Sequence, residues 1–529
     1  MAALLYALCV FPTTLATIGV GLSPNGVTEL FGNSFGLPGE NATYDYIVVG
    51  GGTAGNAIAA RLALDPAMTF AGQLWGYNGR EILYVAGQTF GGSSASNYIG
   101  YARATEGTFD EWSKIVDDDL WSWENVYPAY KKSCNFTAPN YNKIDPSFNI
   151  SYDVSAFEST GGPLQVSYGN YLGPYGPYLE ESLDKLGFER LPGFNSGRLI
   201  GYATITTAID PEEATRSSSE TSFLQLAAQH SNIKLYPQTL GSRILFDENK
   251  QATGVEVQTN SSTSKFKYHL NANKEVIVSA GTWHSPQILM LSGYNIPIVA
   301  DLSGVGQGAR DQPWMALSYK VNVTTGTQVA AGNAEFSAAR VEEYLTNQTG
   351  LLSSIGGGQA LAFENQSTRD FLDTFPSDWP EANYLSLEYG SYPSDLGPDD
   401  NYLTTGSTLL TTSGDQEQAI AALQRIREIA FNSTIVEEEY LPGPNVTTRT
   451  EILEWLKDNM SLIYHATSSC KMGISNDTTA VVVSRARVRG VTGLRVVDAS
   501  AFPLVPPTFP MATVYMFAEK IAESILGGQ

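Results

Sequence analysis

The chain has 529 residues, of which 43% are hydrophobic and 11% aromatic, and its formal net charge at pH 7 is −23. A chain of this length and composition is expected to fold as a globular protein with two domains around substantial cores. The strong negative charge repels polyanions, which excludes nucleic acid and anionic membranes as expected partners. Solubility is the simplest explanation of the charge.

The first 21 residues carry no charge and are rich in Ala, Leu, Val and Thr, with breaks at Pro12 and Gly19. This run is too short and too interrupted for a membrane span, and it predicts a signal peptide over residues 1–21, although a basic start is missing. The alternative is a disordered or buried N-terminus. Eleven Asn-X-Ser/Thr sequons favour secretion and glycosylation. They are Asn41, Asn135, Asn149, Asn260, Asn322, Asn347, Asn365, Asn432, Asn445, Asn459 and Asn476.

A buried strand, a glycine turn and an Ala-rich helix are predicted over residues 44–62, which read YDYIVVGGGTAGNAIAARL. Gly50 permits the tight turn, Gly52 lets the main chain approach a pyrophosphate, and Gly55 lets the helix pack closely on its strand. The helix N-terminus, at Thr53 and Ala54, supplies unpaired N–H groups to the phosphates. The pattern indicates a dinucleotide site.

The acidic residue that usually completes such a site is missing. A dinucleotide unit normally ends its second strand in Asp or Glu about 20 residues after the glycines, where the carboxylate binds the adenosine ribose. Residues 68–75 fill that place and hold no acid, Asp65 comes while the helix is still ending, and Glu81 lies beyond a turn at residues 76–79. The ribose contact is therefore in doubt.

Cysteine is scarce, because a chain without its signal peptide keeps only Cys134 and Cys470. This excludes a disulfide scaffold and a zinc protein, and no metal site is predicted. Pairing of the two cysteines in an oxidising compartment stays open.

Further along the chain, residues 275–280 and 494–499 are short apolar runs followed by small residues, which is typical of strands in a sheet covered on both faces. They could extend the sheet that residues 46–49 begin, so the nucleotide domain is expected to be discontinuous. Residues 416–431 predict an amphipathic helix whose apolar stripe faces the core.

Four further motifs accompany the first glycine turn. They are a second glycine-serine turn at residues 87–97 (GQTFGGSSASN), residues 281–293 (GTWHSPQILMLSG) after a buried strand, residues 301–307 (DLSGVGQ), and residues 465–473 (HATSSCKMG) ahead of a closing VDAS at residues 497–500. Together these motifs resemble the glucose-methanol-choline (GMC) family of flavin oxidoreductases. The resemblance runs in register from about Tyr44 to the C-terminus.

The resemblance implies an α/β fold with FAD, rather than NAD, as the cofactor. It implies a discontinuous Rossmann-like FAD-binding domain (residues 40–120, 215–311 and 459–529) and an α+β substrate domain carrying an antiparallel sheet (residues 121–214 and 312–458). Gly50, Gly52, Thr53, Ala54 and Gly55 would hold the pyrophosphate. Gly91, Gly92, Ser93 and Asn97 would line the flavin, with Asp498 and Ala499 near its ring and ribityl chain.

The family oxidises alcohols, with a base taking the hydroxyl proton while hydride passes to flavin N5. Histidine suits this role because its ordinary pKa of about 6.5 lies near working pH. The chain has four histidines. His230 and His269 are expected to be exposed, and His284 to pack or cap. Only His465 matches the family's base, and the alternative is a core histidine beside the Cys470 loop.

A second His or Asn normally assists from a C-terminal motif, and the register held by Thr513 and Tyr515 places Phe509 at that position. A phenyl ring neither ionises nor forms conventional hydrogen bonds. Loss of a positioned acid-base group typically costs a factor of about 10² to 10⁴. The substitution therefore weakens the prediction of ordinary alcohol oxidation.

The chain is also shorter than the family after Asp65-Pro66 and after Ser292, either by adaptation or through an altered splice or gene model.

The sequence leaves three functions open. The first is a secreted FAD-dependent oxidase or dehydrogenase that acts on CH–OH groups of a small molecule, with secondary metabolism as a possible context. The second is a redox-neutral cyclase of the versicolorin B synthase type, which Phe509 and the missing acid favour. The third is a non-catalytic glycoprotein that binds little flavin. The oligomeric state is not predicted.

Overall fold

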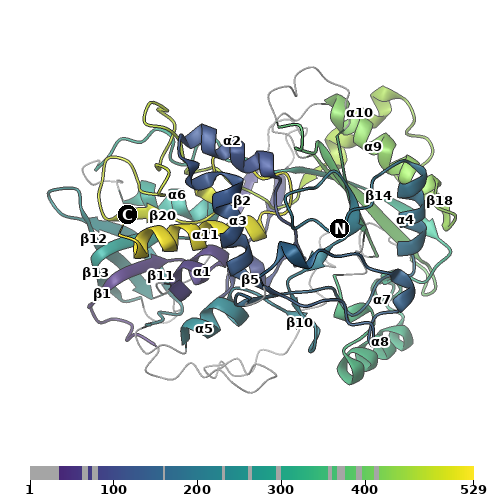
Figure 1. Ribbon diagram of the computed structural model, residues 1–529, viewed down its shortest axis with the longest axis horizontal. Helices are drawn as coiled ribbons and strands as arrows, with labels where there is room; N and C mark the ends of the chain where they lie inside the picture. The colour runs from purple at the N-terminus through teal and green to yellow at the C-terminus, as the bar shows by residue number, and fades with distance from the viewer. Residues whose placement is uncertain are drawn as a thin grey trace.

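The computed structural model describes residues 35–61, 70–73, 81–158, 161–228, 233–259, 265–292, 299–355, 360–365, 376–388, 393, 396–409 and 416–528. Two β-sheets dominate these residues and lie at opposite ends of the view in Figure 1, the first beside the C-terminal helix and the second beside helices of the later chain. The predicted signal peptide, His230 and Asn260 lie outside the described residues.

The first sheet is assembled from distant parts of the chain. Its strands run in the order β1 (Ala42–Val49), β13 (Lys267–Val278), β12 (Ala252–Thr259) and β11 (Thr239–Phe246), and β20 (Leu494–Val496) also pairs with β13. Strand β13 is parallel to β1 and β20 but antiparallel to β12. Residues 276–278 are completely buried, as expected for a strand covered on both faces. The predicted strands at residues 46–49, 275–280 and 494–499 are confirmed.

Helices cover this sheet. Helix α1 (Thr53–Arg61) follows the glycines of β1 and packs on α11 (Met511–Leu526), which in turn packs on α3 (Trp123–Ser133), as Figure 1 shows. The Arg61 guanidinium lies 2.7 Å from the buried Glu519 carboxylate and ties α1 to α11. Helix α6 (Gly281–Leu291) follows β13 and packs against β11. The strand, turn and helix predicted from residue 44 onward are therefore confirmed.

The second sheet has seven strands and is antiparallel throughout. Its strands are, in order, β18 (Val436–Leu441), β14 (Pro313–Val321), β17 (Tyr402–Leu409), β16 (Ala382–Leu387), β15 (Ala360–Glu364) and β7 (Gly201–Thr204), with β19 (Ser461–Leu462) also on β14. Helix α9 (Gln416–Phe431) packs on β17 and buries Ile420, Leu423 and Ile426. The predicted helix at residues 416–431 and the predicted antiparallel sheet are confirmed.

Shorter strands and the remaining helices connect and flank the two sheets. The helices are α2 (Glu106–Val116), α4 (Gly176–Lys185), α5 (Gln225–Ala228), α7 (Thr327–Ala330), α8 (Ala334–Asn347) and α10 (Arg449–Asn459). The short strands are β2 (Phe70–Gln73), β3 (Glu81–Tyr84), β4 (Gly100–Tyr101), β5 (Cys134–Phe136), β6 (Leu164–Val166), β8 (Thr206–Thr207), β9 (Ile209–Asp210) and β10 (Thr215–Arg216). Among the described helices, none is long and apolar enough to cross a membrane.

The domain boundaries stay a prediction. All strands of the first sheet fall in the segments predicted for the FAD-binding domain, and most strands of the second fall in those predicted for the substrate domain. Helix α3, in a predicted substrate segment, nevertheless packs on α11, which lies in a predicted FAD segment. Strand β19, in a predicted FAD segment, joins the second sheet. Cys134 and Cys470 are both buried and free, so the disulfide that the sequence left open is absent.

Candidate active site

The first glycine turn connects β1 to α1 and packs against the residues that follow β13. Gly50 has a φ of +122°, and a Cβ added there would lie 2.2 Å from the main-chain oxygen of Ser279. Only glycine accommodates both this backbone conformation and this close approach. The turn therefore lies beside the carboxyl ends of two parallel strands, where open α/β sheets bind their ligands.

The second glycine turn docks directly on the first. The Gly91 amide donates to the Gly51 carbonyl at 2.9 Å, and Gly92, with a φ of +50°, lies so close that an added Cβ would be 2.6 Å from the Gly52 Cα. The residues predicted from two separate motifs thus form one continuous main-chain surface. A Cβ on Gly92 would fill the space between the turns.

The N-terminus of α1 opens at this surface. The first helical hydrogen bond runs from the Asn56 amide to the Gly52 carbonyl. The N–H groups of Thr53, Ala54 and Gly55 precede it and have no partner within the helix, which is the arrangement that binds phosphate. The pyrophosphate of a dinucleotide fits this cradle of glycines and helix amides.

The adenosine end of the site is less complete. Among the described strands, β13 is the only partner of β1, and β2 and β3 form a separate antiparallel hairpin rather than a second strand of the first sheet. The described residues therefore offer no strand that ends in an acid beside the cradle, in agreement with the missing acid of the sequence. Residues 62–69 and 74–80 lie outside the described residues.

A buried polar network that the sequence reasoning missed joins the two turns. Asn56 Nδ2 donates to Ser219 Oγ at 3.1 Å, and the Ser219 amide donates to Ser94 Oγ at 3.0 Å. Ser94 Oγ also donates to the Gly91 carbonyl at 2.6 Å. Ser219 is the last of three consecutive serines far from either motif, so only the fold brings it here.

The part of the second turn that is predicted to line the flavin contacts another residue, Arg216, that was not predicted. Arg216 Nη1 donates to Asn97 Oδ1 at 3.0 Å and to the Ser94 carbonyl at 3.2 Å. Asn97 also receives the Ile99 amide at 3.0 Å, and its Nδ2 lies 3.2 Å from the Met511 sulfur. Desolvation lowers the pKa of Arg216 from its ordinary value. Ser93, by contrast, is exposed at this turn.

Asp498 lies at the end of β20 and links three segments. One carboxylate oxygen accepts the Gly281 amide at 2.9 Å and the Ser285 hydroxyl at 2.5 Å, while the other accepts the Ser500 amide at 2.8 Å. Burial raises the pKa of Asp498. The carboxylate thus fixes the start of α6 against the segment that contains Ala499, and contact with the cofactor stays a prediction.

His465 lies in the loop that follows β19, after Tyr464. The same loop continues to Ser468, which contacts Ala499. Its amide donates to Asp311 Oδ1 at 2.9 Å, and its Nδ1 lies 2.6 Å from Gln312 Oε1. Tyr464 has a φ of +64°, a strained conformation that clusters at functional sites. Burial lowers the pKa of His465 to about 3, so the imidazole is neutral at physiological pH.

Phe509 contacts His465. The two ring centroids are 5.6 Å apart with an interplanar angle of 68°, an edge-to-face contact. The phenyl ring also packs on Gly100, near the second glycine turn. The Ser468 amide donates to the Ala499 carbonyl at 3.0 Å, so the His465 loop is tied to the Asp498 segment. The structure therefore links His465 to the Asp498 segment and places Phe509 beside Gly100.

The remaining histidines are elsewhere. His269 is exposed as expected, and its Nε2 lies 4.0 Å from the Glu256 carboxylate. Desolvation lowers the pKa of His284, opposed by a hydrogen bond to the main chain of Ala280 and by the charge of Asp498. His284 lies in the first turns of α6 and is half-buried, and the expectation that it packs or caps stays a prediction. In the part of the chain that the structure describes, no cluster of three His, Cys, Asp or Glu side chains could hold a metal ion.

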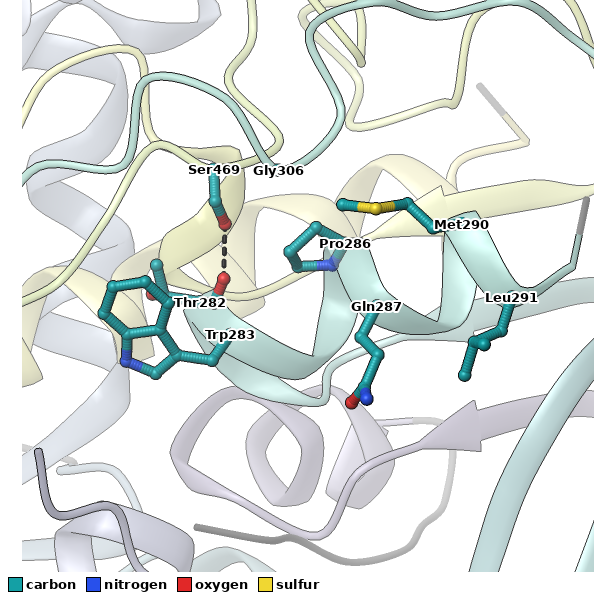
Figure 2. A pocket seen from close by; sticks show the side chains of 8 residues that line it. All are labelled: Thr282, Trp283, Pro286, Gln287, Met290, Leu291, Gly306 and Ser469. Atoms are coloured by element: carbon teal, nitrogen blue, oxygen red, sulfur yellow. Dashed lines mark hydrogen bonds between the residues drawn. The ribbon is translucent and has the colours of Figure 1, made fainter. Parts of the chain in front are cut away.

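A cavity of about 460 Å³ lies along α6, and Figure 2 shows Trp283, Pro286, Met290 and Leu291 around it. Ser469 reaches the cavity from the His465 loop and donates to the Thr282 carbonyl. None of the predicted site residues lines the cavity. Neither His465 nor Phe509 faces this cavity as a lining residue.

Comparison with known proteins agrees with this geometry. Two family models described as GMC oxidoreductase match residues 44–313 and 396–518. The glucose methanol choline oxidoreductase atC of Aspergillus terreus is 39% identical over 98% of this chain and 99% of its own length. Its alignment spans 613 residues, more than the 529 of this chain, so the relative has residues without a counterpart here.

The versicolorin B synthase stcN of Emericella nidulans is 34% identical over 93% of this chain and 90% of its own length. An FAD-dependent oxidoreductase from Chaetomium thermophilum shares the fold, with a TM-score of 0.78 and 23% identity over 92% of this chain and 99% of its own. The chain belongs to the GMC oxidoreductase family, and its cofactor is FAD.

Proposed function

We propose that this flavin-dependent oxidoreductase oxidises a CH–OH group of a small molecule to a carbonyl, with His465 as the base. The observation that supports the proposal most directly is the placement of a neutral imidazole on a loop tied to both the Ala499 segment and Asp311. When bound, FAD supplies the hydride acceptor at its N5 atom.

The chain's own residues would bind the cofactor and accept the proton. The glycine turns and the first turn of α1 hold the pyrophosphate, and His465 takes the hydroxyl proton of the substrate. Because burial disfavours the imidazolium, we expect proton transfer in concert with loss of the hydride rather than ahead of it. The phenyl ring of Phe509 excludes water from one side of the imidazole without taking part in proton transfer.

The test is anaerobic reduction of the bound flavin by a broad panel of primary and secondary alcohols, followed by absorbance. The protein should bleach with at least one alcohol, and His465→Gln should slow the bleaching by a factor of about 10² to 10⁴ while keeping its flavin. Flavin-loaded protein that bleaches with no member of the panel would contradict the proposal.

A second candidate is a redox-neutral cyclase that keeps the fold. Phe509, in place of the usual His or Asn, and the similarity to versicolorin B synthase favour it. Mass spectrometry of the product separates the two functions, because cyclodehydration removes water whereas oxidation removes two hydrogen atoms. Membership of an enzyme family and the assembled glycine cradle favour either reaction over a non-catalytic glycoprotein.

We also propose that the chain enters the secretory pathway and is glycosylated. Of the ten sequon asparagines among the described residues, nine are exposed, and Asn135 is half-buried with its Nδ2 bonded to Gln165. Secreted protein from a eukaryotic host should therefore lose mass on treatment with an N-glycan amidase, with Asn135 unmodified. An unchanged mass, or protein retained in the cytosol, would contradict this proposal.

A further inference from the structure

Gln312 makes the only side-chain hydrogen bond to the His465 ring that involves described residues. It directly precedes β14, it is 2% exposed, and its Oε1 lies 2.6 Å from His465 Nδ1. The neighbouring Asp311 contacts His465 through the main-chain amide. The orientation of the imidazole therefore depends on Gln312 rather than on Asp311.

The amide of Gln312 has only one orientation that satisfies its surroundings. Its Nε2 donates to the Pro506 carbonyl at 2.8 Å and reaches the Thr508 carbonyl at 3.5 Å. A carbonyl oxygen can only accept, so the NH₂ group must face the segment that precedes Phe509. The Oε1 atom is thereby turned toward His465 and acts as an acceptor.

An acceptor at 2.6 Å requires His465 Nδ1 to carry a proton. In a neutral imidazole the other nitrogen is then unprotonated, because the hydrogen bond at one ring nitrogen determines the state of the other. His465 Nε2 thus holds the lone pair that accepts a proton. Phe509 cannot set this tautomer, since a phenyl ring neither donates nor accepts a conventional hydrogen bond.

We propose that Gln312 is a positioning residue that holds His465 in the Nδ1–H tautomer and leaves Nε2 as the ring nitrogen that accepts a proton. This role rests on the proposed oxidation for its catalytic meaning, but the tautomer itself can be measured without substrate. Gln312 also joins the loop of the base to the loop that carries Phe509. Without the amide, the His465 tautomer would no longer be fixed, and the two loops would no longer be held together.

The experiment is ¹⁵N NMR of the flavin-loaded protein with labelled histidine at pH 8. The chain has four histidines, and His465→Gln identifies the resonances of His465 by their loss. We expect a protonated Nδ1 and an unprotonated Nε2. A protonated Nε2 in the unmodified protein would overturn the proposal.

Gln312→Met removes the amide at similar volume and should give a mixture of tautomers at His465. Flavin reduction should slow by roughly 10-fold or more, less than the factor of about 10² to 10⁴ for loss of the base itself. Gln312→Glu loses the N–H donors to the Pro506 and Thr508 carbonyls but keeps an acceptor for Nδ1. It should therefore keep Nδ1 protonated, which a merely structural role would not predict. An unchanged tautomer and rate in Gln312→Met would overturn the proposal.

Gln418→Met is the matched control. Gln418 is also 2% exposed, and its Nε2 donates to a main-chain carbonyl, that of Glu381 at 3.0 Å, but it lies on α9 in the second sheet's core. This control should leave the His465 resonances unchanged. If the tautomer behaves as expected while no alcohol reduces the flavin, the proposed oxidation fails and the positioning by Gln312 stands.

Discussion

The glycine cradle and the surroundings of His465 are built in different ways. The cradle consists of main-chain atoms from two short segments, held so closely that the Gly91 amide bonds to the Gly51 carbonyl at 2.9 Å. The His465 site consists of side chains from segments more than 150 residues apart, such as Gln312 and His465. A main-chain site tolerates little change in residue size, whereas a side-chain site can change its chemistry by a single substitution.

The presence of Phe509 illustrates this difference. The two turns contain the glycines that the family resemblance predicts, whereas Phe509 stands where the same resemblance predicts a second polar group beside the base. The cofactor site therefore depends on main-chain geometry, and the reaction depends on a few exchangeable side chains. The predictions below test each half of this comparison.

The largest effect is expected at the cradle. Gly92→Ala would place a Cβ 2.6 Å from the Gly52 Cα at a φ of +50°. To relieve this clash, either the first turn would have to shift together with α1, or the second turn would have to shift. We expect purified protein without bound FAD, with little or no recovery of the flavin spectrum after FAD is added. Absorbance and fluorescence titration with FAD measure the loss.

Gly187→Ala is the control for this variant. Gly187 also has a positive φ, of +83°, but an added Cβ there meets no atom within 4 Å. Backbone strain of about 1 kcal/mol is expected in both variants, and only Gly92→Ala adds the steric clash. Equal loss of FAD in the two variants would show that the close contact between the turns is unimportant.

Much of the cradle was predictable from sequence, because its glycines and helix start are local patterns with a direct physical reading. The strand at residues 275–280 and the helix at residues 416–431 were predictable for the same reason. Ser219, Arg216 and Gln312 were not predicted, because each is brought to the site by contacts between segments distant in sequence. His465 and Phe509 were identified by family resemblance alone, since nothing in their local pattern distinguishes a base from a core histidine.

A smaller effect is expected at the side-chain site. Phe509→His would place a hydrogen-bonding group beside His465, where the rings now meet edge to face at 5.6 Å. If the chain oxidises alcohols, flavin reduction should accelerate by about 10-fold, part of the factor that a positioned acid-base group supplies. Phe509→Leu, which removes the ring without adding a polar group, should not accelerate it. No acceleration in Phe509→His would favour the redox-neutral reaction instead.

The smallest effect concerns Asp311, whose Oδ1 accepts the main-chain amides of both His465 and Gln312. Burial raises the pKa of Asp311 to about 7. Above this pH the carboxylate is ionised, and its negative charge favours the protonated imidazole that forms as His465 accepts a proton. The rate of flavin reduction should therefore rise with pH by roughly 3- to 10-fold, with an inflection near pH 7. A rise of this size corresponds to a rise of about half to one unit in the pKa of His465 when Asp311 ionises.

Asp311→Asn keeps an oxygen acceptor for both amides but cannot ionise, so the inflection should vanish and the rate should stay at the acidic plateau. Glu388→Gln is the matched control, because burial raises the pKa of Glu388 to about 8 in a different part of the fold, beside Tyr171 and Gly326. An inflection that persists in Asp311→Asn and disappears in Glu388→Gln would assign the pH dependence to Glu388 beside the second sheet. The His465 site would then be governed by its hydrogen bond to Gln312 rather than by a neighbouring charge.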